Sequence, residues 1–343
     1  KETKYNINTT HSINDDSSNE QHARSLAEQG GLVSALWAGQ TPSIKSGKAR
    51  RLSIGFADDV TAYELRLGLP SPPGDGSPFS LDPQVKEETI RTLGKPHVRL
   101  LERRKESVML RDEEGRPQTF AGVIDISESV LSQLAEPHRY PVLSILRERL
   151  RRWRFYHQIR TDQDSPLRSP QIGTRTPVMA HDGRDLAAAL ETIRQNGNDR
   201  ELDASIAEAF DGASLVIDAV DTRLHLALQT PGVFRPMDAT ELSDGTLRYL
   251  ALLAALRTPR PPELLVFNEP ETSLHPRLLA PLGRQIIEAS KQSQIIVVSH
   301  AQPLVDAIAA HKDATRIDLV KIAGATTVAN RRTMDEPSWK WTS

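Results

Sequence analysis

The order of hydrophobic and polar residues in the first two thirds of this sequence predicts short strands and helices. Apolar and polar residues alternate over 50–69, 106–120 and 213–229, as is typical of paired strands with one buried face. Asp58-Asp59 predicts the turn of the first pair. Helical spacing of apolar residues recurs over 127–136, 141–152, 183–196 and 199–210.

The pattern changes in the last third. Residues 244–257 are apolar on nearly all sides, which predicts a deeply buried helix. Two short apolar runs, 264–267 and 295–298, are typical of parallel strands that are covered on both faces. Residues 276–290 have helical spacing and begin with a proline in the first turn. The sequence therefore predicts a strand, helix, strand unit with a right-handed crossover.

Both apolar runs end in polar residues that are suited to chemistry. Asn268 and Glu269 follow the first run, and Ser299 and His300 follow the second. The carboxyl ends of parallel strands meet at one edge of a sheet, where ligands bind. We therefore expect Glu269 and His300 to be close, although each alone is better explained as an ordinary strand-end residue.

The residues just before the buried helix, Leu242 to Leu250 (LSDGTLRYL), predict a helix N-terminus. Ser243 can cap the helix, and Gly245 allows close backbone approach to a ligand. The free N–H groups and the helix dipole favour an anion there. Taken alone, a simple helix cap explains these residues equally well, although capping does not require the glycine.

Composition excludes several kinds of chemistry. The chain has 343 residues, 38% of them hydrophobic and 26% charged, and a net charge of −2, so no overall charge attracts it to nucleic acid or anionic membranes. It has no cysteine, which excludes disulfides, thiolate metal sites and cysteine nucleophiles. Neither an apolar stretch of membrane-spanning length nor a signal peptide is visible, so we expect a cytoplasmic protein without a membrane partner.

The order of these motifs resembles the C-terminal half of an ABC-type ATPase head. The resemblance is closest to the RecF-like, SMC-related group of AAA-family ATPases, which includes AbiEii-toxin-like proteins. LSDGT resembles the ABC signature, LLVFNEPE the Walker B strand, TSLHP the D-loop and VVSH the switch histidine. The resemblance implies an α/β fold, a P-loop NTPase head with a parallel core sheet, an antiparallel β lobe and a helical insertion. We expect a polar, disordered or foreign segment at 1–22, a β-rich lobe at 23–126, the insertion at 127–210 and the C-terminal lobe at 211–343.

The resemblance also implies roles for individual residues, with ATP and Mg²⁺ as cofactors of a head-to-tail homodimer. Glu269 would polarise the attacking water, and His300 would contact the γ-phosphate. The remaining residues that it implies are Ser243, Asp244 and Gly245 for nucleotide binding across the dimer, Gln158 as sensor of metal and nucleotide, Ser273, Leu274 and His275 as the D-loop, and Asn268 for the metal.

Two departures from the family pattern weaken the expectation of hydrolysis. Asn268 stands where Walker B usually has an aspartate, which keeps an oxygen but loses the charge that Mg²⁺ favours. No GxxxxGK[ST] occurs in the chain, and Gly47-Lys48 is followed by Ala49. Because the chain starts at Lys1 and its first twenty residues differ in composition from the rest, we expect the P-loop to have been truncated or replaced.

Three functions follow as expectations. The first is ATP hydrolysis that drives dimer engagement, in DNA repair or phage defence. The second is a catalytically deficient, ATPase-like scaffold that binds an effector protein. The third is a nucleic-acid-binding subunit that uses the basic and aromatic stretch 147–160, with stacking by Trp153, Phe155 or Tyr156. An amphipathic helix followed by a strand is the simpler explanation of that stretch.

Overall fold

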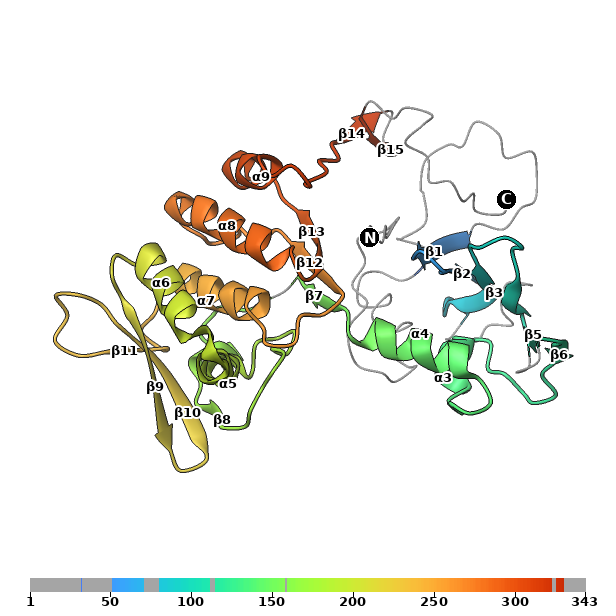
Figure 1. The fold of residues 1–343 in the computed structure, drawn as a ribbon, viewed down its shortest axis with the longest axis horizontal. Helices are drawn as coiled ribbons and strands as arrows, with labels where there is room; N and C mark the ends of the chain where they lie inside the picture. Colours follow the sequence, from blue (N-terminus) through green and yellow to red (C-terminus); the bar gives the residue numbers. More distant parts are fainter. Residues whose placement is uncertain are drawn as a thin grey trace. The chain divides into compact units, whose positions relative to one another are not determined.

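The computed structural model describes residues 32, 51–70, 80–111, 115–157, 159–322 and 325–329. The chain divides into two compact units (Figure 1). The first unit contains the residues up to Arg151 and those from Ile317 onward, and the second unit is Arg152–Arg316. The predicted segment 1–22 lies outside the described residues.

The first unit is built on a six-stranded antiparallel sheet whose strands follow one another in chain order. Its strands are β1 (Arg51–Ala57), β2 (Thr61–Gly68), β3 (Gln84–Thr92), β4 (Arg99–Arg104), β5 (Ser107–Arg111) and β6 (Pro117–Thr119). The unit also contains helices α3 (Val130–Gln133) and α4 (Pro141–Arg151) and the hairpin β14 (Leu319–Ile322) and β15 (Ala325–Val328). The hairpins predicted at 50–69 and 106–120 are confirmed as β1–β2 and β5–β6.

A fully buried ion pair fixes the segment before α3 to this sheet. Glu88 and Arg103 have no exposed surface, and their charged groups lie 3.7 Å apart. Glu88 accepts hydrogen bonds from the Tyr63 hydroxyl at 2.9 Å and the Val130 N–H at 2.8 Å. Arg103 donates to the carbonyl of Asp125 at 2.7 Å. Burial raises the pKa of Glu88 and lowers that of Arg103, because it disfavours the charged form of each side chain. The hydrogen bonds and the opposite charge of the partner offset this cost.

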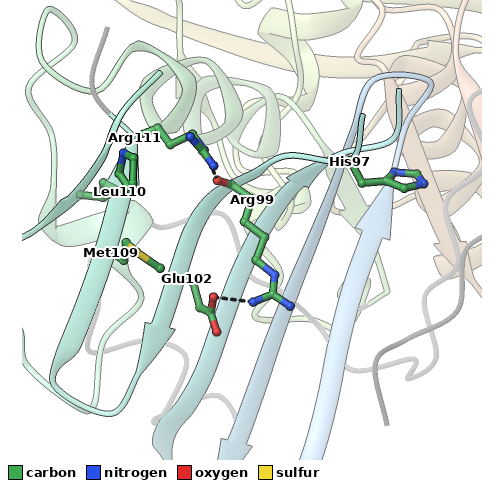
Figure 2. Close-up of a pocket in the computed structure, with 7 residues that line it drawn as sticks. His97, Arg99, Glu102, Met109, Leu110 and Arg111 are labelled. Atoms are coloured by element: carbon green, nitrogen blue, oxygen red, sulfur yellow. Dashed lines mark hydrogen bonds and ion pairs between the residues drawn. The ribbon is translucent and has the colours of Figure 1, made fainter. Parts of the chain in front are cut away.

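A shallow pocket of about 290 Å³ lies on the outer strands of this sheet (Figure 2). Its two guanidinium groups are engaged by neighbours. Arg99 donates to Glu102 at 2.7 Å, and Arg111 donates through Nε to the Arg99 carbonyl at 2.9 Å. The charge of Arg99 is therefore balanced by a carboxylate, whereas Arg111 is held in place by backbone carbonyls.

The second unit contains a three-stranded parallel sheet in the order β13, β12, β7. These strands are β7 (Arg154–Tyr156), β12 (Leu264–Asn268) and β13 (Gln294–Val298). Asn268 pairs with Val298, and Phe267 pairs with both Val297 and Tyr156, so the three strands end at the same level. The parallel arrangement of β12 and β13 confirms the predicted unit, and β7 is a third member that the periodicity did not reveal.

Helices pack around this sheet (Figure 1). They are α5 (Leu186–Ile193), α6 (Asp199–Ala209), α7 (Asp244–Leu256), α8 (Leu279–Ala289) and α9 (Gln302–Ala309), with shorter turns η1 (Pro166–Arg168), η2 (Arg194–Asn198) and η3 (Pro276–Leu278). Helix α7 packs against α5 and α8, and its residues from Leu247 to Leu256 are all buried. The prediction of a deeply buried helix there is confirmed.

A second, antiparallel sheet completes this unit. It consists of β8 (Gln171–Ile172), β9 (Ser214–Val220), β10 (Arg223–Gln229) and β11 (Met237–Asp238), with β10 in contact with the other three strands. Helices α5 and α6 pack on it. The β9–β10 hairpin was predicted over 213–229 and is confirmed.

Two expectations about this architecture differ from the structure. The prediction that β13 is covered on both faces is wrong, because all five of its residues are only half-buried. Among the described residues β13 is an edge strand with β12 on one side, which explains its exposure. The predicted insertion 127–210 is divided between the two units at Arg151, since α3 and α4 belong to the first unit and α5 and α6 to the second.

Candidate functional site

The carboxyl edge of the parallel sheet brings together the acid and the imidazole that follow β12 and β13. Glu269 donates its N–H to the Val298 carbonyl at 2.8 Å, which extends the strand pairing by one bond. The side chains then meet, with Nε2 of His300 3.5 Å from Oε1 of Glu269. The side chain of Glu269 is 47% exposed and that of His300 is 84% exposed. Both groups are therefore accessible to a ligand and to water.

The backbone of Glu269 is held in an unusual conformation. Its φ of +47° lies in the left-handed region that residues other than glycine rarely adopt. Its carbonyl accepts hydrogen bonds from Thr272 N–H and from Nη2 of Arg248, both at 3.1 Å. Such conformations persist where surrounding contacts fix them, and they occur often at functional sites. The bend directs the chain out of the sheet immediately after β12.

Glu271 holds the turn that carries His300. Its Oε1 accepts hydrogen bonds from Ser299 Oγ at 2.8 Å, His300 N–H at 2.8 Å and Ala301 N–H at 3.1 Å. Sequence reasoning missed Glu271. Its position two residues after Glu269, on the same strand-end loop, was a signal that could have revealed it.

Arg248 links the buried helix α7 to two strand ends. It is 8% exposed, and it donates through Nη1 to the Ile159 carbonyl at 3.2 Å and through Nη2 to the Glu269 carbonyl. Burial lowers the pKa of Arg248, and the charges of Glu271 and Glu269 oppose this effect. Arg248 was also missed, although a cation within the otherwise apolar stretch 247–256 was a visible signal.

The N-terminus of α7 has the cap that the sequence predicted. Ser243 Oγ accepts a hydrogen bond from Thr246 N–H at 3.1 Å. A Cβ atom on Gly245 would lie 2.5 Å from the carbonyl oxygen of Ser273, so the glycine is required by the loop after β12 of the same chain. The close approach predicted at Gly245 is therefore made to this loop, and Ser273 itself has a φ of +64°.

Arg168 anchors the residues that precede α7. Its guanidinium donates to the carbonyls of Ala239, Thr240 and Leu242 and to Oδ1 of Asp244, the last at 2.6 Å. The carboxylate of Asp244, which replaces a glycine of the usual signature, therefore has a cation as its partner. Arg168 is distant from Asp244 in the sequence, and no pattern pointed to this contact.

The other predicted residues lie around the same edge or outside the described part. Asn268 is the half-buried last residue of β12. Leu274 donates its N–H to the Glu271 carbonyl at 3.0 Å, and His275 caps η3 by accepting from Arg277 N–H at 3.3 Å. Gln158 lies outside the described residues, two positions after the end of β7.

The structure does not favour nucleic-acid stacking by the stretch 147–160. Trp153 and Tyr156 are buried, with 3% and 2% of their surface exposed. Arg147 donates to carbonyls at the end of α3, and Arg149 pairs with Asp58. The helix-and-strand explanation is confirmed by α4 and β7.

The described residues contain no group of three or more His, Cys, Asp or Glu side chains that could hold a metal ion. Within the same residues, no helix is both long enough and apolar enough to cross a membrane.

The fold is thus of the α/β class, with a parallel core sheet, antiparallel sheets and surrounding helices. The sequence matches the family described as "AAA domain, putative AbiEii toxin, Type IV TA system" over residues 44–306. This match covers more than half of the chain, and the protein belongs to this family of AAA ATPases. A search of curated proteins found no match.

Among solved structures, the chain is similar to SMC head domains. The head domain from Thermotoga maritima is 14% identical, with 80% of this chain and 75% of that chain covered and a TM-score of 0.32. An SMC head from Pyrococcus furiosus, bound to the C-terminal domain of ScpA, is 13% identical, with coverage of 79% and 77% and a TM-score of 0.38. The family assignment stands on the sequence match.

Proposed function

We propose that this protein binds and hydrolyses ATP at the carboxyl edge of its parallel sheet. The observation that carries the proposal is the meeting of Glu269 and His300, 3.5 Å apart at the ends of two adjacent parallel strands. Ligands bind beyond the carboxyl ends of strands in such sheets. Membership of an AAA ATPase family supports a nucleotide as the ligand.

In this proposal Glu269 is the general base. A water molecule beside its half-exposed carboxylate would be oriented for attack and would give up its proton there. His300, whose Nε2 faces the same carboxylate, would donate a hydrogen bond to the terminal phosphate. Phosphoryl transfer depends mainly on positioning and on charge neutralisation, so two rigid strands suit this role.

The same edge fits Mg²⁺ through few protein ligands. Mg²⁺ is usually held by one or two protein oxygens together with waters and substrate phosphates. Asn268 offers an amide oxygen at the end of β12. In this proposal it holds the ion together with waters and substrate phosphates, and the ion would supply positive charge to the phosphates.

We further propose that two copies engage head to tail. The resemblance of residues 242–246 to an ABC signature and of 272–276 to a D-loop supports this arrangement. Ser243 and Gly245 would then contact nucleotide held by the partner copy, and Ser273, Leu274 and His275 would lie between the two sites. The family description, which names a putative toxin of a type IV toxin–antitoxin system, supports a setting in phage defence more directly than one in DNA repair.

The test is the variant Glu269→Gln. It keeps the size of the side chain but removes the base, so ATP turnover should fall by about 10²- to 10⁴-fold while nucleotide binding persists. The measurement is phosphate release by residues 1–343 and by the protein with any coding sequence that precedes Lys1. Glu288→Gln is the matched control, because Glu288 is an exposed residue that pairs with Lys291. Equal turnover by both variants would contradict the proposal.

A second candidate is an ATPase-like scaffold that binds a partner without turnover. Asn268 and the absence of GxxxxGK[ST] from the sequence favour it. The variant Asn268→Asp separates the two functions. If the protein is an ATPase, restoring the carboxylate should strengthen Mg²⁺-dependent nucleotide binding, measured by calorimetry. A scaffold would bind no nucleotide before or after the substitution.

A further inference from the structure

Two residues of opposite charge, the buried Arg248 and the half-buried Glu271, contact the backbone around the Glu269–His300 pair. Neither belongs to the pair that would react with a nucleotide. Each, however, forms hydrogen bonds to the backbone next to that pair. Each also has one polar side-chain atom without a hydrogen-bond partner among the described residues.

Glu271 acts on the turn after β13. All three hydrogen bonds to its Oε1 come from consecutive residues, Ser299, His300 and Ala301. An ionised carboxylate makes stronger hydrogen bonds than a neutral acceptor does. The direction in which His300 leaves the strand is therefore set by a residue on the neighbouring strand-end loop.

Arg248 acts on the other two strand ends. Its two terminal nitrogens donate to the carbonyl of Ile159, three residues after β7 ends, and to the carbonyl of Glu269, directly after β12. Because Arg248 is in α7, these bonds connect the helix that Ser243 caps with the strained backbone of Glu269. Arg248 and Glu271 together contact the segments that follow all three parallel strands.

The two side chains also have complementary unsatisfied atoms. Nε of Arg248 and Oε2 of Glu271 are buried, and neither has a hydrogen-bond partner among the described residues. A buried donor or acceptor that has no hydrogen-bond partner lowers the stability of the folded protein. Among its charged neighbours, Glu271 raises the pKa of Arg248 the most. Ordered water, or a bridge between the two side chains, would satisfy these atoms.

We propose that Arg248 and Glu271 are positioning residues that together connect helix α7 to Glu269 and His300, so that the position of α7 sets the geometry of this pair. The catalytic meaning of this connection rests on the proposed ATP hydrolysis, whereas the mechanical connection does not. A displacement at the Ser243 end of α7 would reach Glu269 through Arg248 and the His300 turn through Glu271.

The first test measures the connection without nucleotide. In the variant Glu271→Gln, the amide hydrogens of His300 and Ala301 should exchange with solvent at least about tenfold faster, because the charged acceptor is lost. The variant Arg248→Met should also accelerate their exchange if the two residues act together. The control Glu288→Gln should leave these amides unchanged. Unchanged exchange in Arg248→Met, in a variant that retains its thermal unfolding midpoint, would overturn the proposal.

The second test measures coupling. The double variant Arg248→Met/Glu271→Met replaces both charges with apolar side chains of similar length, which guards against an unpaired buried charge. If the residues act as a connected pair, the double variant should accelerate exchange at His300 by less than the product of the accelerations in the two single variants. Purely multiplicative effects would overturn the proposal.

ATP turnover gives the third readout. Each single variant should lower kcat by about 10- to 100-fold with little change in KM, as expected when supporting residues around a site are lost. Absence of turnover in the unmodified protein would refute the proposed hydrolysis and leave the exchange results to decide the connection. Normal kcat in both single variants would overturn the positioning role.

Discussion

Gly245 lies at the second position of helix α7, directly against the backbone of the loop after β12. A Cβ there would be 2.5 Å from the Ser273 carbonyl oxygen, closer than real Cβ contacts allow. The obstacle is backbone, which cannot move aside as a flexible side chain can. At this single residue, local preference and tertiary packing act in opposite directions, because alanine is the better helix former by roughly 1 kcal/mol.

The variant Gly245→Ala decides between these two effects. Overpacking typically costs about 1–3 kcal/mol, so we expect the free energy of unfolding to fall despite the gain in helix propensity. The measurement is the midpoint of urea unfolding. Gly94→Ala is the control, because a Cβ on Gly94 would meet nothing within 4 Å. A rise in stability of the Gly245 variant would show that the loop after β12 does not press on α7.

The segment that leads into α7 is an element fixed by polar contacts. Arg235 contacts both carboxylate oxygens of Glu241 at 2.7 Å, and Asp238 N–H donates to the same carboxylate at 3.1 Å. Arg168 holds the next residues by their carbonyls. These contacts set the point at which the chain enters the helix.

The contacts of Glu241 in the segment before α7 should stabilise the protein less in acid. The hydrogen bonds from Arg235 and Asp238 lower the pKa of Glu241 from its ordinary 4.5 to about 2. Because the folded pKa is the lower one, the stabilisation is present above pH 4.5 and is lost as the pH falls toward 2. The stability difference between the unmodified protein and Glu241→Gln, small because the pair is exposed, should therefore shrink from pH 7 to pH 3. Urea unfolding at both pH values checks this, and a difference that grows in acid would contradict it.

At the scale of the whole molecule, the two units differ in how the chain builds them. The first uses residues from both ends of the sequence, whereas the second is the continuous segment Arg152–Arg316. The main hydrophobic core of that segment runs from Tyr156 to Leu304, so all of its members lie inside the segment.

We therefore expect residues 152–316 to fold alone. A unit with its own core should unfold in a single cooperative transition, which calorimetry and near-ultraviolet circular dichroism can detect. The shorter fragment 211–316 is the control, since it lacks β7, α5 and α6 and should not show such a transition. A fragment 152–316 without cooperative unfolding would mean that its core needs the other unit.

Most elements near the site could be predicted because their signals are local. The apolar runs of β12 and β13, the cap at Ser243 and the buried surface of α7 follow from spacing within a few residues of the chain. The meeting of Glu269 and His300 followed from one further rule, that parallel strands end together. The third strand, β7, was harder to place in this sheet because only three of its residues pair with β12, too few for a periodic pattern.

The sequence alone determined an α/β arrangement with an acid and an imidazole at the ends of two strands, because periodicity and strand-end chemistry are written in neighbouring residues, and its motifs resembled those of an ATPase head. Only the tertiary structure decided what holds that pair in place. Glu271 contacts the turn of His300, Arg248 reaches Ile159 and Glu269, and Gly245 meets Ser273. Each of these contacts joins residues far apart in the chain, and folding brings them together through packing that no local pattern encodes.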